Sequence, residues 1–271
     1  MPTNPLEIKL VVFDWAGTTI DHGCLAPAGA FVTSFATKGV SVTLAEARGP
    51  MGLHKKDHIR AMLRTDSVGG KWRAAVGREW LESDVESLYR DVTPRQVEAA
   101  EKYSDLIAGV PEVMNELRAK GIKIAATTGY FREAADVVLA AAKRQGYSPD
   151  FNICADDVPA GRPAPWMIFR CLESLSVYPP SAVVKVGDTV IDIEDGCNAG
   201  CWSVGVVDSS NEMGLSEAEL KTLPTGDLNA RRESIAKRYS AAGAHAMIEG
   251  ISNLPALLAE LNARLAKSER P

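Results

Sequence analysis

Acidic, hydroxyl and guanidinium side chains lie in the segments that come after short apolar runs of the sequence. These residues are Asp14, Thr128, Arg162, Asp188 and Asp192. A carboxylate can attack phosphorus as a nucleophile, and two or three carboxylates can hold Mg²⁺, which prefers oxygen ligands. A hydroxyl, backbone N–H groups and a cation can bind the non-bridging oxygens of a phosphoryl group. Together these residues predict phosphoryl chemistry that depends on Mg²⁺.

Two of the aspartates also have a simpler interpretation. Asp14 and Asp188 could each merely cap the helix that follows it, because a carboxylate accepts hydrogen bonds from the free N–H groups of a helix start. For either aspartate alone the sequence does not separate the two interpretations. The occurrence of four such motifs in one order favours the chemical interpretation.

A lysine in the segment 51–63 could carry out a second kind of chemistry. If this segment is helical, spacings of three and four residues place Lys55 beside an apolar stripe that also carries a histidine; the members of this face are Met51, Lys55, His58, Ile59 and Met62. A lysine partly removed from water has a lowered pKa, and Schiff-base formation requires a neutral amine. The same pattern fits a lysine whose stem covers the stripe while its ammonium stays in water, which is the commoner fate.

The elements that would position these residues alternate between strands and helices. Strands are predicted at 10–13, 122–126 and 182–186, with weaker candidates at 151–154 and 202–206, and helices at 112–120, 132–145, 165–175 and 190–199. This alternation predicts a doubly wound parallel α/β sheet with a Rossmann-like topology. Ligands bind beyond the carboxyl ends of the strands in such sheets, so the polar residues should meet at one edge.

One long stretch interrupts the alternation. Between the first two strands the patterns are helical, at 28–38, 56–64, 72–80, 83–92 and 94–103. We therefore expect an inserted all-helical cap domain over 23–103, and a catalytic core made of 1–22 and 104–271. The C-terminal part is expected to be mostly helical, with a possible short strand at 246–249.

Length and composition exclude several classes of protein. The chain has 271 residues, of which 46% are hydrophobic and 24% charged, as in ordinary globular proteins. A net charge of −5 lacks the excess of positive charge that is typical of general nucleic-acid binding. No apolar run is long enough to span a membrane, and the start of the sequence does not resemble a secretory signal. Five cysteines without a CxxC pair suggest neither a disulfide framework nor a zinc site, so we expect a cytoplasmic protein.

The four motifs resemble those of the haloacid dehalogenase superfamily along the whole chain. The resemblance implies that Asp14 is the nucleophile, that Thr128 binds the phosphoryl group, and that Arg162 stands where the superfamily has a lysine or arginine. It also implies that Mg²⁺ is held by Asp14, Asp188 and Asp192 and by the backbone carbonyl of Ala16. Phosphatases of this superfamily carry a second aspartate at the position of Ala16, which protonates an alcohol leaving group. Alanine cannot do so, and an ordinary phosphate-ester hydrolase is therefore disfavoured.

Longer segments resemble one family within that superfamily, the phosphonoacetaldehyde hydrolases. The segments are FDWAGTT, DHGCLAP, PMGLHKKDHIR, TTGYFRE, DDVPAGRPAPWM and KVGDTVID. The resemblance implies that Lys55 forms an imine with the substrate aldehyde, that His58 is a candidate proton shuttle, and that the substrate pocket includes Cys24, Met51, Gly129 and Tyr130. For His58 a purely structural role fits the sequence equally well.

The implied reaction explains Ala16. An imine at Lys55 withdraws electrons, so the P–C bond can break without expelling a carbanion, and no oxygen leaving group needs a proton from residue 16. Hydrolysis would give acetaldehyde and phosphate, with the segments around 21–24 and 103–111 acting as hinges for cap closure. The family is typically homodimeric. Two alternatives stay open: another phosphatase or dehalogenase of the superfamily, and a catalytically silent protein that binds a phospholigand.

Overall fold

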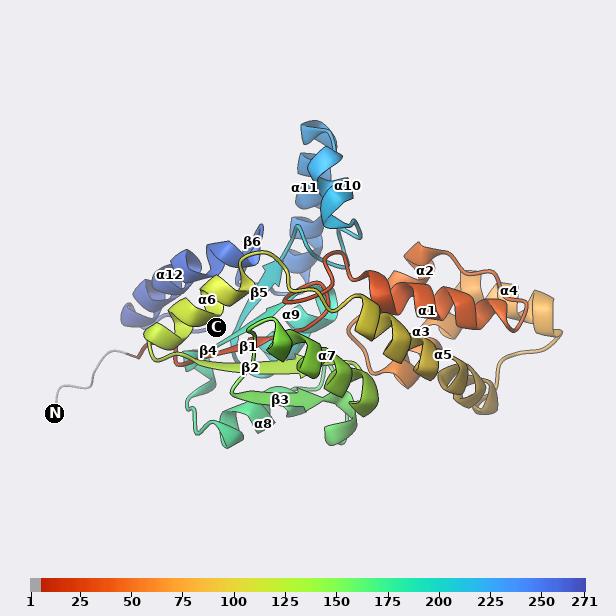
Figure 1. Ribbon diagram of the computed structural model, residues 1–271, viewed down its shortest axis with the longest axis horizontal. Coiled ribbons are helices and arrows are strands. Elements are labelled where there is room, and N and C mark those ends of the chain that lie inside the picture. Colours follow the sequence, from red (N-terminus) through yellow and green to blue (C-terminus); the bar gives the residue numbers. More distant parts are fainter. Residues whose placement is uncertain (1–5) are drawn as a thin grey trace.

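The centre of the computed structural model, which describes residues 6–271, is a six-stranded parallel sheet (Figure 1). The strands lie in the order β3-β2-β1-β4-β5-β6. Their bounds are Leu10–Phe13 (β1), Lys123–Thr128 (β2), Phe151–Cys154 (β3), Val183–Gly187 (β4), Trp202–Val206 (β5) and Ala246–Ile248 (β6). The predicted parallel α/β sheet is confirmed, and the tentative last strand is part of it.

The register of the central strands brings their carboxyl ends to one edge. Phe13, the last residue of β1, lies opposite Ala126 of β2 and Val186 of β4. Asp14 and Asp188 follow β1 and β4 directly, so both lie at this edge. Thr128 is itself the last residue of β2, because that strand runs two residues further than its apolar pattern indicates.

Helices cover both faces of the sheet. Side chains of successive strand residues point to opposite faces: Val11 packs in a cluster with α6, α7 and α12, whereas Val12 packs in a cluster with α8. A further helix, α9, contacts β4 and β5. The bounds of these helices are Val110–Ala119 (α6), Arg132–Arg144 (α7), Trp166–Ser174 (α8), Val190–Asn198 (α9) and Leu254–Ala266 (α12).

A helical insertion between β1 and β2 extends to one side of the sheet (Figure 1). It consists of α1 (Leu25–Ala36), α2 (Leu44–Arg48), α3 (Lys55–Arg64), α4 (Asp66–Val76) and α5 (Glu82–Lys102). Its apolar side chains form a cluster of their own that includes Phe31, Trp72 and Leu88. Within 14–122, all of which the structure describes, no strand occurs. The limits of the insertion as a separate domain stay a prediction.

One helix of the insertion differs from its prediction. The segments 83–92 and 94–103 were expected to form two helices, whereas α5 is continuous with Pro94 in its interior. A proline inside a helix removes one hydrogen bond and costs about 3 kcal/mol. Because α5 packs along α1 and α7, burial of its apolar face offsets this cost.

Two smaller differences concern α2 and α4. The short helix α2 has no counterpart among the predicted helices; the Thr43 side chain caps its start in a capping box with Glu46. The helix predicted over 72–80 is instead α4, which starts after Thr65, whose hydroxyl accepts the N–H of Val68, and ends before Gly77 in a left-handed conformation. Local caps therefore set both boundaries.

The C-terminal part is mostly helical, as predicted. Helices α10 (Glu217–Thr222) and α11 (Thr225–Ala241) project away from the sheet, and α12 returns to it (Figure 1). Within residues 6–271, none of the helices combines the length and apolar character needed to cross a membrane.

Candidate active site

A cavity lies where the carboxyl edge of the sheet meets the helical insertion. It is lined by Asp14, Ala16, Cys24, Pro27, Met51, Gly52, Lys55, Thr128, Gly129, Tyr130, Arg162, Asp188 and Thr189. The structure thus brings the predicted site residues to one cavity from segments far apart in the sequence. Asp192 and His58 are the two predicted residues that do not line it.

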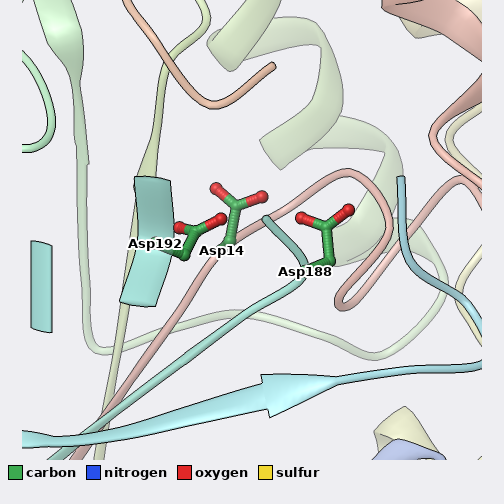
Figure 2. A group of neighbouring side chains, drawn as sticks. All are labelled: Asp14, Asp188 and Asp192. Carbon is green, nitrogen blue, oxygen red and sulfur yellow. The ribbon is translucent and has the colours of Figure 1, made fainter. Parts of the chain in front are cut away.

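Three aspartates gather on the sheet side of this cavity (Figure 2). Carboxylate oxygens of Asp14, Asp188 and Asp192 lie within 4.8 Å of one another, and all three residues are buried. Oδ2 of Asp188 accepts a hydrogen bond of 2.8 Å from the backbone N–H of Asn211. Oδ1 of Asp188 is buried and has no hydrogen-bond partner in the described part of the chain. An unpartnered buried carboxylate oxygen next to two other carboxylates is suited to a cation.

The electrostatics of this cluster also favour a cation. Burial raises the pKa of Asp188 well above its usual range, and the charges of Asp14 and Asp192 raise it further. Burial likewise raises the pKa of Asp14, although Arg162 opposes the shift. Burial and the neighbouring carboxylates therefore disfavour the charged forms of Asp14 and Asp188. Oxygen-only donors and excess negative charge fit a hard divalent cation.

Arg162 is the cation that contacts this cluster most closely. Its guanidinium is buried, and it reaches Oδ1 of Asp14 at 2.7 Å and Oδ1 of Asp192 at 2.9 Å. Its Nη2 also donates to the hydroxyl of Thr127 at 2.6 Å. These contacts hold the guanidinium beside the proposed nucleophile, where it can neutralise charge on a transferring group.

Two cations, Arg162 and Lys185, hold the carboxylate of Asp192, which does not line the cavity. Lys185, a fully buried lysine of β4, donates to Oδ1 of Asp192 at 2.8 Å, and the Thr189 hydroxyl donates to Oδ2 at 2.6 Å. Burial alone would raise the pKa of Asp192, but Arg162 and Lys185 outweigh it and lower the pKa to about 2. Asp192 is therefore ionised at neutral pH.

Replacing Lys185 by methionine is expected to lower the free energy of unfolding by about 3 kcal/mol, because breaking a buried ion pair leaves a charge without its partner. Urea unfolding measures this change. Lys120→Met is the matched control, since the pair between Lys120 and Glu116 is exposed and such pairs contribute about 0.5 kcal/mol or less. An unchanged urea midpoint in Lys185→Met would contradict the prediction.

Lys55 enters the cavity from the helical insertion. It is the first residue of α3 and only 3% exposed. Its Nζ lies 5.0 Å from the ring centre of Tyr130 and 5.8 Å from that of Phe31. Burial lowers the pKa of Lys55 to about 8, although Cys24 and Asp14 oppose the shift. The amine of Lys55 is therefore buried rather than left in water.

The insertion and the core approach each other closely near Lys55. A Cβ added at Gly129 would lie 2.8 Å from the backbone carbonyl oxygens of both Gly52 and Leu53. Only a residue without a side chain allows the backbone of 52–53 to come so near the end of β2. This contact brings Lys55 and the carboxyl edge of the sheet to the same cavity.

Sequence comparisons place the chain in a known family. The model of the haloacid dehalogenase-like hydrolases matches residues 8–200. A phosphonoacetaldehyde hydrolase from Syntrophobacter fumaroxidans is 45% identical, over 97% of this chain and 95% of that protein. One from Bacillus cytotoxicus is 45% identical, over 93% of this chain and 96% of that protein. The chain belongs to the phosphonoacetaldehyde hydrolase family of the haloacid dehalogenase-like hydrolases.

Solved structures agree with membership of the phosphonoacetaldehyde hydrolase family. A phosphonoacetaldehyde hydrolase-like protein from Oleispira antarctica superposes with a TM-score of 0.96 at 38% identity, covering 100% of this chain and 99% of that one. A putative β-phosphoglucomutase from Bacteroides vulgatus has a TM-score of 0.67 at 16% identity, covering 97% of this chain and 92% of that one. The second likeness shows a shared fold alone.

His58 lies behind the cavity wall of this family member rather than in it. Its ring stacks on Phe31 with ring centres 3.9 Å apart, and its Nε2 lies 2.8 Å from the carbonyl oxygen of Ala47. Its Nδ1 has no partner in the described residues. Burial, reinforced by the charge of Lys55, lowers the pKa of His58 well below its usual value. The imidazole is therefore neutral, and its role as a proton shuttle stays a prediction.

Sequence reasoning missed the side chains that hold Arg162 and Asp192. Thr127 and Lys185 contact them directly, and Asp195 places Oδ2 3.6 Å from Nε of Arg162. A signal existed for Lys185, because a lysine in the middle of a run of valines is costly unless it is paired. Asp195 follows Asp192 by three residues, a spacing that puts both on one face of α9.

Proposed function

We propose that this protein hydrolyses the P–C bond of phosphonoacetaldehyde, giving acetaldehyde and phosphate. The observation that carries the proposal is the buried Lys55 amine, with its pKa lowered to about 8, in the same cavity as Asp14. An amine that can be neutral and a carboxylate nucleophile are the two groups that this cleavage needs. The names of the relatives support the same substrate.

The first step joins the substrate to Lys55. The neutral amine adds to the aldehyde carbon, and loss of water leaves a C=N bond. His58, three residues from Lys55 on α3, is proposed to relay a proton in this step, and its partnerless Nδ1 among the described residues supports that role. Protonation of the imine nitrogen makes it a strong electron acceptor.

The second step breaks the P–C bond. A carboxylate oxygen of Asp14 attacks phosphorus, while the electrons of the P–C bond move into the protonated imine and leave an enamine on Lys55. Arg162 and Thr128 both line the cavity and can bind the phosphoryl oxygens as charge develops. Because carbon is the leaving atom and the imine receives its electrons, no acid is required at Ala16.

The last steps restore the protein. The enamine carbon takes up a proton, and water hydrolyses the resulting imine to release acetaldehyde from Lys55. A second water hydrolyses the aspartyl phosphate at Asp14 and releases phosphate. Each turnover thus consumes one water overall, because imine formation releases one of the two.

The metal is proposed to be Mg²⁺, held by Asp14, Asp188 and Asp192 with the backbone carbonyl of Ala16. When bound, it neutralises the clustered carboxylates and the phosphoryl oxygens. The small, oxygen-only donor set supports this choice.

A coupled assay tests the proposed function. Acetaldehyde and phosphate should appear in equal amounts from phosphonoacetaldehyde with Mg²⁺, and both should fall at least tenfold with excess EDTA and recover when Mg²⁺ is restored. Ordinary phosphate monoesters and a halo-acid serve as control substrates. Preferential turnover of either control, or binding of phosphonoacetaldehyde without release of phosphate, would reject the proposal.

Three further proposals concern the cap, the oligomeric state and the location of the protein. Residues 23–103 are inferred to act as a cap that closes on a core of 1–22 and 104–271, which is supported by the separate apolar cluster of the insertion. The family resemblance supports a homodimer, which light scattering tests. Five free cysteines support a reducing, cytoplasmic location.

A further inference from the structure

Arg48 and Asn211 connect the helical insertion to the core at a point outside the cavity wall. Arg48 is the last residue of α2, and Asn211 lies in the loop that follows β5. Nη1 of Arg48 lies 3.2 Å from Oδ1 of Asn211. In return, Nδ2 of Asn211 donates to the backbone carbonyl of Arg48 at 3.2 Å. The two residues therefore pair in both directions.

Arg48 also hydrogen-bonds to the backbone that leads into the insertion. Its Nη1 donates to the carbonyl of Gly23 at 2.7 Å and lies 3.3 Å from that of Cys24. The backbone N–H of Gly23 donates to the carbonyl of Ser209 at 2.8 Å. The guanidinium of Arg48, at the end of α2, thus contacts both the segment 23–24, where the insertion begins, and the loop after β5.

The same loop holds one carboxylate of the acidic cluster. The backbone N–H of Asn211 donates to Oδ2 of Asp188 at 2.8 Å. The backbone of Gly17 also lies close to this oxygen, because a Cβ added at Gly17 would come within 2.1 Å of it. The Ser209 hydroxyl donates to the carbonyl of Gly17 at 2.7 Å. Oδ2 is thereby fixed between two backbone segments, and Oδ1 keeps no partner among the described residues.

We propose that Arg48 and Asn211 are positioning residues for the metal site. Their pairing holds the loop after β5 while the insertion lies against the core, and the loop in turn orients Asp188 with Oδ1 free for the cation. The inference rests on the proposed use of Mg²⁺, and it links the position of the insertion to metal affinity. Neither residue touches substrate in this scheme.

Calorimetric titration with MgCl₂, in the absence of substrate, tests the proposal. Arg48→Ala and Asn211→Ala should each weaken Mg²⁺ binding about tenfold, the lower end of the effect seen when groups behind metal ligands are removed. The double variant should bind no more weakly than the weaker single variant, because the two residues act as one unit. Thermal melting establishes that each variant is folded.

Arg238→Ala is the matched control. Arg238 lines the same surface cavity as Arg48 and Asn211, but it pairs with Glu212 and is more than half exposed. Its removal changes the local charge equally and should leave the Mg²⁺ affinity unchanged. If Arg48→Ala does not fold, Asn211→Ala carries the test, since Arg48 then keeps its bonds to Gly23 and Cys24.

The outcomes separate this inference from the proposed function. Folded Arg48→Ala or Asn211→Ala protein with the parent Mg²⁺ affinity would overturn the positioning role, as would an equal loss of affinity in Arg238→Ala. A parent that binds no Mg²⁺ would overturn it as well. A parent that binds Mg²⁺ tightly without cleaving phosphonoacetaldehyde would count against the proposed function alone.

Discussion

A Lys55→Arg variant is expected to lose at least about three orders of magnitude in turnover of phosphonoacetaldehyde, the scale seen when a covalent nucleophile is removed from an enzyme. The reason is that the side chain of residue 55 must lose its proton before it can form the imine. Burial lowers the pKa of Lys55 to about 8, so about a tenth of the amine is neutral at pH 7. Arginine keeps the positive charge but stays protonated in proteins, and it cannot form the imine.

Lys56→Arg provides the matched control. Lys56 is the next residue of α3, but it does not line the cavity, and its Nζ pairs with Oε1 of Glu86 at 2.7 Å. This variant should retain the parent rate. Reduction with borohydride in the presence of phosphonoacetaldehyde should attach a group derived from the two-carbon substrate to Lys55, both in the parent and in Lys56→Arg. Peptide mass spectrometry locates this adduct. Parent-level turnover by Lys55→Arg, or an adduct on residue 56 alone, would refute an imine at Lys55.

The fold could be predicted because its strongest signals are local. Short apolar runs that end in polar residues indicated five strands, and the parallel register then placed Asp14 and Asp188 at one edge. Boundaries were less accurate, since caps such as Thr65 and packing around Pro94 set them. The apolar pattern of a segment therefore predicts that an element exists better than it predicts where the element ends.

The sequence predicted which residue types lie at the strand ends of the site, but not the contacts between distant segments. Lys55 and His58 share a face of α3, yet His58 is covered by Phe31 from another helix, which spacing within one helix cannot show. The pairing of Arg48 with Asn211 joins positions 163 residues apart. No local pattern encodes such a contact, because it depends on how the insertion lies against the core.

Asp14→Asn is expected to abolish phosphate release, with a fall in turnover of at least about three orders of magnitude. Asparagine has nearly the shape of aspartate, so the fold should persist, but its amide is a poor nucleophile. The imine should still form, because the charge of Asp14 raises the pKa of Lys55, and its removal increases the fraction of neutral amine. Borohydride should therefore trap an adduct on Lys55 although no phosphate appears.

Asp208→Asn is the control for this variant. Asp208 lies beyond β5 at the same edge of the sheet, where it pairs with Arg232, and it does not line the cavity. It should keep the parent rate. The two measurements on Asp14→Asn distinguish the steps of the mechanism: an adduct without phosphate places Asp14 after imine formation, as proposed. Loss of both would mean that Asp14 is needed to admit the substrate. Phosphate release at the parent rate would exclude Asp14 as the nucleophile.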